Sequence, residues 1–322
     1  MDDVVTSTDT QVVSVISVIL VNYAAPEETI RCLKSLKSLA YPENTSLQIV
    51  VVDNASPDQS VEMLQRYLSE NVSDEKVQLI ASSVNGGFSA GNNLGIQWAL
   101  ETYKDKLSHV WLLNNDTEPE PTALNELLNV VQQQAALKND VLVGSLLRYP
   151  DGQFQQGGIR INHWTGQLRG YPESSHLTPR QVDAVSGASL LIPRCVLDLV
   201  GRLEESHFLY VEDVDYCLKA KSVGVKTWLC PNSVVIHDEG ASTGKEGKRA
   251  SALTQYYYQR NRMVVLAQYG HPLQWVTFHG YTLFRWLRMG VKALFNPSRR
   301  EEWRVLTRAL CDYGRGKRFA SF

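Results

Sequence analysis

The sequence contains no uncharged apolar run of about 18 residues, so it predicts no transmembrane helix. Its five cysteines are widely spaced and form no Cys-x-x-Cys pair, which disfavours a structural zinc site and favours a reduced, cytosolic protein. The first dozen residues are acidic and lack the basic segment of a signal peptide. The formal net charge is −2, so bulk charge predicts neither a nucleic-acid nor a membrane partner.

Motifs of the common nucleotide-dependent folds are also missing. The turn after the first apolar run has no glycine, so the Gly-x-Gly-x-x-Gly dinucleotide fingerprint is absent. Residues 240–245, GASTGK, have three residues between the glycines where a P-loop has four, and Glu246 follows where Ser or Thr is required. No His-Glu-x-x-His or Gly-x-Ser-x-Gly motif occurs. These absences disfavour the ordinary nucleotide-cofactor folds.

The first half of the sequence alternates apolar strands with helices. Nearly continuous β-branched runs are typical of parallel strands covered on both faces, and helical patterns follow the runs at 13–20, 47–52, 77–80 and 110–113. Four such units predict an α/β protein with a mostly parallel sheet and right-handed crossovers. Further along, the pattern predicts an excursion over 151–182, a closing strand pair within 226–237 and helices through 254–322.

Polar residues follow each of these four strands. They are Asn22 and Tyr23, Asp53 and Asn54, the loop 85–93 (NGGFSAGNN), and Asn114 to Asp116. Each turn taken alone is explained by helix capping. Because ligands of a parallel sheet bind where loops meet at the carboxyl ends of the strands, the four turns together predict a ligand with several polar parts.

In chain order these motifs, with SGASLLI, FLYVEDVDYCLKAKSVG and VVIHDEGAST, resemble a family 2 glycosyltransferase of the GT-A fold, in particular bacterial rhamnosyltransferase-like members. The resemblance spans residues 14–265 and implies a nucleotide-sugar donor, a divalent metal and inversion at the sugar carbon. It also implies a mostly parallel sheet flanked by helices with a C-terminal helical extension. We expect a flexible stretch 1–12, a catalytic domain 13–250 with a nucleotide half (13–150) and an acceptor half (151–250), and a helical region 251–322.

By similarity, Asn114-Asn115-Asp116 takes the position of the family's Asp-x-Asp motif, with Asp116 facing the metal. Asn114 departs from the aspartate of many relatives, although an amide oxygen still binds a metal or the ribose. His237 matches the family's metal-binding histidine. Mg²⁺ or Mn²⁺ suits such ligands when the phosphates supply the rest. The alternative is a polar turn that caps the next helix.

Glu212, Asp213 and Asp215 lie together at the start of a short predicted helix. The resemblance places the catalytic base at Asp213 and leaves Glu212 to position the acceptor. Clustered carboxylates raise one another's pKa, as a proton acceptor near neutral pH requires. Three acids at a solvated helix N-terminus, favoured by the helix dipole, are the alternative.

The resemblance implies further contacts. Asp53 would accept from the ring N–H of uracil or thymine, unless it only forms an Asx turn. The glycines leave room for the donor, and Arg260 and Asn261 would reach the diphosphate, unless they are ordinary helix residues. Ser186, Gly187 and Ala188 would form the acceptor-side wall, together with Glu212. The loop 238–248 would close over the donor. The predicted donor contacts are Asn22, Tyr23, Asp53, Asn54, Asn85, Gly86, Gly87, Gly91, Asn92, Asn93, Asn114, Asn115, Asp116, Arg260 and Asn261.

The C-terminal region is basic and amphipathic. Arg285, Arg288 and Lys292 fall on one side of a predicted helix, and Leu283 and Leu287 are among the apolar residues on the other. Such a segment either lies on the inner face of the cell membrane, or packs on its own domain or on a second subunit in a homodimer.

The sequence therefore predicts an inverting, metal-dependent glycosyltransferase that moves rhamnose or a similar hexose from a dTDP- or UDP-sugar to a glycan or polyprenyl-linked acceptor, in surface polysaccharide synthesis. A pyrophosphorylase-type sugar-nucleotide transferase is one alternative, disfavoured because no Gly-rich basic loop follows the first strand. A non-catalytic nucleotide-sugar-binding module is another, disfavoured by the presence of both Asp116 and Asp213.

Overall fold

The computed structural model describes residues 14–71, 76–175, 178–238 and 252–317. Within them, the main sheet has the strand order β10-β12-β6-β11-β4-β1-β2-β3, with β5 paired to β12 and β7 to β6. The predicted flexible stretch 1–12 lies outside the described residues, as do residues 239–248 of the loop expected to close over the donor.

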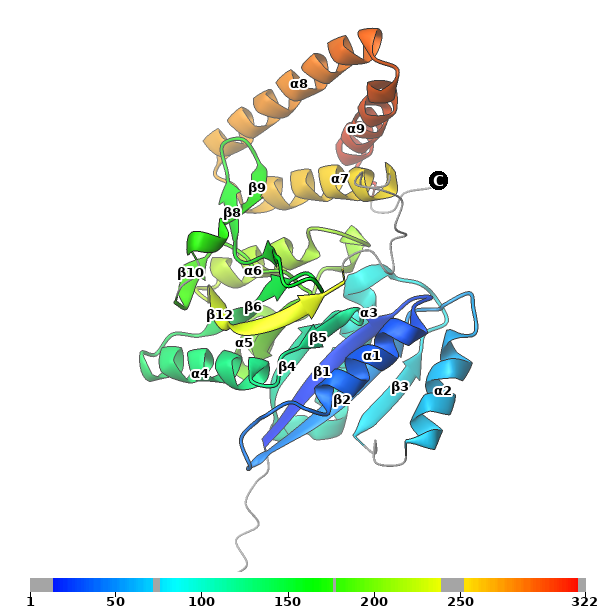
Figure 1. Cartoon of the computed structure of the whole chain (residues 1–322). Helices are drawn as coiled ribbons and strands as arrows, with labels where there is room; N and C mark the ends of the chain where they lie inside the picture. Colours follow the sequence, from blue (N-terminus) through cyan, green and yellow to red (C-terminus); the bar gives the residue numbers. More distant parts are fainter. Residues whose placement is uncertain (1–13, 72–75, 176–177, 239–251, 318–322) are drawn as a thin grey trace, which may run out of the picture.

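The four predicted strand–helix units are present, and the α/β class is confirmed (Figure 1). The strands are β1 (Ser14–Asn22), β2 (Thr45–Asp53), β3 (Val77–Ala81) and β4 (Leu107–Leu113), all parallel. The helices are α1 (Pro26–Leu36), α2 (Ser60–Glu70), α3 (Gly87–Tyr103) and α4 (Ala123–Ala136). The sheet order 3-2-1-4 makes the chain reverse direction between β1 and β4, which is where parallel sheets bind ligands.

The second half of the sheet is mixed rather than parallel. β11 (Ser189–Pro193) runs antiparallel between β4 and β6 (Val141–Arg148). The predicted strand pair within 226–237 is instead one strand, β12 (Lys226–His237), whose register with β6 shifts between Cys230 and Val234. Pro231 lies at this shift and has no N–H for the ladder, so a bulge absorbs it without ending the strand.

The remaining short strands and helices lie between these strands in the sequence. They are β5 (Thr117–Pro119), β7 (Phe154–Gln156), β8 (Ile159–Asn162), β9 (Gln167–Gly170), β10 (Arg180–Val182), α5 (Arg194–Val200), η4 (Glu205–His207) and α6 (Glu212–Ser222). β8 and β9 form the hairpin expected within 151–182.

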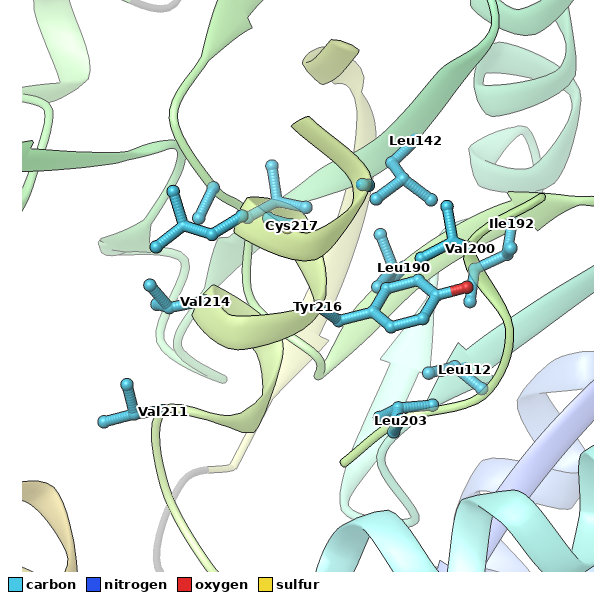
Figure 2. Packing of buried hydrophobic residues seen from close by; sticks show 14 of the residues in the cluster. Leu112, Leu142, Leu190, Ile192, Val200, Leu203, Val211, Val214, Tyr216 and Cys217 are labelled. Atoms are coloured by element: carbon cyan, nitrogen blue, oxygen red, sulfur yellow. The ribbon is translucent and has the colours of Figure 1, made fainter. Parts of the chain in front are cut away.

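Buried apolar clusters cover both faces of the sheet. α1, α2 and α4 pack on one face, and α3, α5 and α6 on the other. Figure 2 shows the second cluster, in which Val214 and Tyr216 of α6 lie with the strand residues Leu112 and Leu190. The Tyr216 hydroxyl also donates to the Gly201 carbonyl at 3.0 Å. This packing fixes the position of α6, whose first residues are the predicted acids.

The C-terminal region forms three helices, α7 (Ala252–Tyr269), α8 (Pro272–Phe295) and α9 (Ser298–Gly314). α7 lies along the part of the chain that contains the main sheet, while α8 and α9 extend away from that part (Figure 1). The indoles of Trp286 and Trp303 join α8 to α9, with ring centroids 5.6 Å apart. No helix in the described part of the chain has the length and apolar character needed to cross a bilayer.

Candidate active site

A cavity of about 820 Å³ lies at the carboxyl ends of β1, β2 and β4, a size that suits a ligand such as a sugar nucleotide. It brings together thirteen residues singled out from the sequence. They are Tyr23, Asn54, Asn85, Gly87, Asn114, Asn115, Asp116, Ser186, Gly187, Ala188, Glu212, Asp213 and His237. The others, Asn22, Asp53, Gly86, Gly91, Asn92, Asn93, Arg260 and Asn261, are not among the residues that line it.

Beneath the cavity, a buried hydrogen-bond network joins the ends of β1, β2 and β4. The Asp53 carboxylate accepts from Asn22 Nδ2 at 2.7 Å and from the backbone N–H and hydroxyl of Ser56 at 3.0 and 2.6 Å. The Thr29 hydroxyl donates to Asn22 Oδ1 and accepts from Asn115 Nδ2. The Asp53 carboxylate therefore accepts within its own turn, from the N–H three residues on, and with Asn22 it lies beneath the cavity.

The glycine loop after β3 is held by Asn54. Its amide donates to Asn85 Oδ1 and to the Gly87 carbonyl, both at 3.0 Å. Gly87 has φ +84° and an added Cβ would overlap the Phe208 carbonyl, so glycine is required there. Gly91 packs on Val21 in the same manner, without reaching the cavity.

The two asparagines that follow are structural in their contacts. Asn92 donates to the Phe88 carbonyl within α3. Asn93 donates to the Leu203 carbonyl and to Glu205, and accepts from the Leu203 N–H. Both side chains are buried, and Asn93 ties α3 to the segment that leads into α6.

Asp116 and His237 form a buried pair at one part of the cavity. Asp116 Oδ1 lies 3.3 Å from His237 Nε2 and, although buried, has no hydrogen-bond partner among the described residues. Asn114 Nδ2 lies 3.4 Å from the same ring nitrogen. β5 and β12 bring the two residues together, since Thr117 pairs with His237 across these strands. An unsatisfied carboxylate oxygen facing an imidazole nitrogen is a donor set that suits a divalent cation.

Gln155, which sequence reasoning missed, orients this histidine. Its Oε1 lies 2.9 Å from His237 Nδ1, and its Nε2 donates to the His237 carbonyl at 3.4 Å. With Nδ1–H donating to Gln155, the unprotonated Nε2 faces Asp116, which is the tautomer that a metal ligand needs. No sequence motif marks Gln155, because it lies in the excursion over 151–182 and reaches His237 only through the fold.

No cluster of three His, Cys, Asp or Glu side chains suited to a metal occurs in the described residues. Asp116 and His237 would therefore be joined by ligands from a bound diphosphate, as is usual for Mg²⁺ and related ions. The residues present fit such an ion when a bound diphosphate supplies the remaining ligands.

Glu212 and Asp213 line another part of the same cavity. Asp213 Oδ2 accepts from the Gly187 N–H at 3.0 Å, and Oδ1 accepts from the Val214 N–H at 2.7 Å. Burial raises the pKa of Asp213, while these N–H groups act in the opposite direction. Glu212 Oε2 has no hydrogen-bond partner in the described part of the chain, and burial together with the Asp213 charge raises the pKa of Glu212 to about 8. The two N–H donors favour the charged form of Asp213, whereas Glu212, with a pKa of about 8, is mostly protonated near neutral pH.

The dipeptide Gly187–Ala188 lies between the Glu212–Asp213 pair and the strand end that carries Asn114 and Asp116. Gly187 donates to Asp213, and the Ala188 carbonyl accepts from the Asn114 N–H at 3.1 Å. A Cβ at position 187 would lie 3.2 Å from the Phe88 ring and 3.4 Å from Asp213 Cβ, so glycine allows this close approach. The metal-suited pair and the carboxylate pair are therefore held in one frame.

Arg260 and Asn261 brace the segment that enters α6. Asn261 Nδ2 lies within 2.9 Å of the carbonyl oxygens of His207, Leu209 and Tyr210, and Arg260 Nη2 donates to the Ser206 carbonyl at 2.9 Å. This segment is strained, because Phe208, Tyr210 and Val211 all have positive φ. Both side chains are buried, and the structure places them behind the acids rather than at the cavity.

Sequence comparison identifies the family. The family described as Glycosyl transferase family 2 matches residues 17–198, more than half of the chain. The chain belongs to glycosyl transferase family 2. The predicted family and the predicted enzyme class, a glycosyltransferase, are thereby confirmed.

Similar proteins support the enzyme class and the fold of this glycosyltransferase. It is 26% identical to the N-acetylglucosaminyl-diphospho-decaprenol L-rhamnosyltransferase of Mycobacterium tuberculosis, over 91% of this chain and 98% of that protein. The mannosyltransferase PcManGT from Pyrobaculum calidifontis, solved with GDP-Man and Mn²⁺, shares the fold with a TM-score of 0.56, over 92% of this chain and 86% of that one, at 15% identity. GalNAc-T7, solved with UDP, GalNAc and Mn²⁺, has a TM-score of 0.59 at 18% identity over 77% of this chain, which spans 47% of that protein. These structures confirm the GT-A fold.

In this glycosyltransferase the raised pKa of Glu212 makes a testable contribution to stability. Between the ordinary carboxyl value of 4.5 and about 8, the folded state binds a proton at Glu212 that the unfolded state has lost. The free energy of unfolding therefore falls as pH rises through this window. We expect Glu212→Gln, which cannot ionise, to raise the melting temperature increasingly from acidic to mildly alkaline pH.

Thermal denaturation of both proteins across this pH range checks the prediction. Glu70→Gln, at an exposed glutamate near the end of α2, is the matched control and should give no trend. A difference in melting temperature between Glu212→Gln and the unaltered protein that stays constant with pH would contradict it.

Proposed function

We propose that this glycosyltransferase is an inverting, metal-dependent enzyme that moves rhamnose or a similar hexose from a dTDP- or UDP-sugar to a glycan or polyprenyl-linked acceptor in surface polysaccharide synthesis. The observation that carries the proposal is the joining of the Asp116–His237 pair and the Glu212–Asp213 pair in one cavity through Gly187 and Ala188. The name of the mycobacterial relative, which transfers L-rhamnose to a decaprenol-linked sugar, supports the lipid-linked acceptor and the donor class.

Asp213 accepts the proton of the attacking acceptor hydroxyl in this proposal. The acceptor oxygen then forms a bond to the anomeric carbon, and the bond from that carbon to the diphosphate oxygen breaks. A single displacement inverts the configuration and needs one base only, whereas retention would need a nucleophile on the opposite face. Protonated Glu212 donates a hydrogen bond that orients the acceptor, because none of the described residues hydrogen-bonds to its Oε2.

Asp116 and His237 would hold a Mg²⁺ or Mn²⁺ ion, and rotation of the Asn114 amide would present its oxygen as a further ligand. Such an ion, when bound, neutralises the charge that develops on the departing diphosphate. The Mn²⁺ in the related structures of PcManGT and GalNAc-T7 supports this assignment. Gln155 keeps the His237 tautomer suited to it.

Melting temperatures with a panel of nucleotide sugars, each with and without Mn²⁺, test the donor. The correct donor is expected to raise the melting temperature only when the metal is present, since a ligand that binds the folded state alone stabilises it. GDP-mannose is a control with a different base. Equal stabilisation by all nucleotides, or stabilisation independent of metal, would contradict the proposal.

A further inference from the structure

α8 turns an apolar face to solvent along its whole length. Six residues on this face are each more than half exposed: Leu273, Val276, Leu283, Leu287, Val291 and Leu294. At 100° per residue they fall within an arc of about 80°, on a helix about 36 Å long. The side that packs on the protein is marked instead by Phe278, Thr282 and Ala293, which are buried.

Such a continuous apolar surface is unusual for a soluble monomer and indicates a partner. The residues beside the apolar face indicate a negatively charged partner, because Arg288 and Lys292 are exposed along one edge of it. Residues 271–322 contain ten Lys and Arg but only three acidic residues, a net +7, whereas the whole chain is −2 and residues 1–270 therefore carry −9. The C-terminal region is strongly basic on an otherwise acidic protein.

This charge distribution separates the two candidate occupants. A second copy that paired through the same face of α8 would bring two C-terminal regions of net charge +7 together, which repel each other. A membrane with anionic lipids attracts the basic edge while its acyl region receives the leucines and valines.

Two exposed tryptophans lie next to the N-terminal end of α8. Trp164, in the β8–β9 turn, is 51% exposed, and Trp275, in the first turn of α8, is 45% exposed. The hairpin is fixed on α8 by Gln167 Nε2, which donates to the Tyr281 hydroxyl at 2.7 Å, and Trp164 shares a small cavity with Gln274. Tryptophan is favoured at the boundary between headgroups and acyl chains.

The same hairpin reaches the active-site cavity, since Leu168, Arg169 and Gly170 of β9 are among its lining residues. α8 and the cavity are therefore connected by one two-stranded element. A surface that binds lipid at α8 would bring a lipid-linked acceptor near the cavity entrance.

We propose that α8 lies on an anionic membrane surface, with its apolar face at the boundary between headgroups and acyl chains and its basic edge against the lipid headgroups. This adds a partner to the proposed function and depends on that function only for its biological purpose. Membrane binding by itself requires no transfer reaction.

Flotation of the full-length protein with vesicles tests the proposal. We expect binding to vesicles of phosphatidylcholine with phosphatidylglycerol, little binding to phosphatidylcholine alone, and loss of binding at high salt. Leu287→Glu combined with Val291→Glu is expected to lower the partition coefficient at least about tenfold, because it places two charges in the apolar face.

Leu137→Glu combined with Leu199→Glu is the matched control, since both leucines are exposed away from α8, Leu137 directly after α4 and Leu199 on α5. It should bind as the unaltered protein does. Metal-dependent stabilisation by the donor, measured on every variant, shows that each is folded and separates failure at α8 from failure of the proposed function. Absence of binding to the anionic vesicles, or undiminished binding of the α8 variant, would overturn the proposal. So would a dimer in light scattering that the α8 variant alone dissociates.

Discussion

Asp213→Asn is expected to lower kcat about a thousandfold while leaving the affinity for the donor unchanged. The asparagine oxygen still accepts from the Gly187 N–H, so the frame of the site is kept, but an amide cannot take the proton of the acceptor hydroxyl. Initial rates with varied acceptor, together with donor binding by calorimetry, separate the loss of chemistry from the loss of binding.

Asp198→Asn is the control for this experiment, because Asp198 is an exposed carboxylate on α5 that pairs with Arg194. It should leave kcat within error of the unaltered enzyme. If Asp213→Asn transferred sugar at the unaltered rate, Asp213 would not be the base. The alternative of a non-catalytic binding module predicts no transfer by the unaltered protein either.

Asp116→Ala is the second change with a large expected effect. Removing the buried carboxylate that faces His237 leaves the expected donor set with two neutral protein ligands, His237 and Asn114, and no carboxylate. Several kcal/mol of charge stabilisation would be lost, so kcat/KM is expected to fall about a thousandfold. The stabilisation of the protein by a nucleoside diphosphate with Mn²⁺ should be lost as well, which melting temperatures measure without any turnover.

Glu118→Gln provides the comparison for Asp116, as it removes an exposed carboxylate only two residues away. It should preserve both activity and metal-dependent stabilisation. Retention of Mn²⁺-dependent stabilisation in Asp116→Ala would exclude Asp116 as a ligand. A similar loss in Glu118→Gln would show that general negative charge, and not this site, attracts the metal.

Much of the site could be anticipated because parallel strands end at a common edge. Tyr23, Asn54 and Asn114 are far apart in the sequence, yet the strand–helix pattern alone predicts that residues after successive strands converge. The role of Asp213 was predicted from the family resemblance. The predicted donor contacts Asp53, Asn92 and Arg260 do not line the cavity and form hydrogen bonds within the protein instead. Strand ends and helix starts also carry residues that only hold the backbone, and the sequence does not distinguish these from residues that reach the ligand.

Other features needed the folded structure because they depend on contacts between distant segments. Gln155 orients His237 from an excursion without periodicity. β11 enters the sheet antiparallel between β4 and β6, and a buried apolar strand has the same pattern in either direction. The basic and apolar sides of α8 were visible in the sequence, but not which side packs on the protein.

The sequence by itself determined the α/β class, the four strand–helix units and the types of polar group at the strand ends, because apolar periodicity and local turn chemistry act over a few residues. Only the tertiary structure decided which of those groups enter the cavity, which brace it from behind, and which face of α8 remains exposed. These outcomes depend on the packing of segments separated by many residues, and local sequence patterns do not determine that packing.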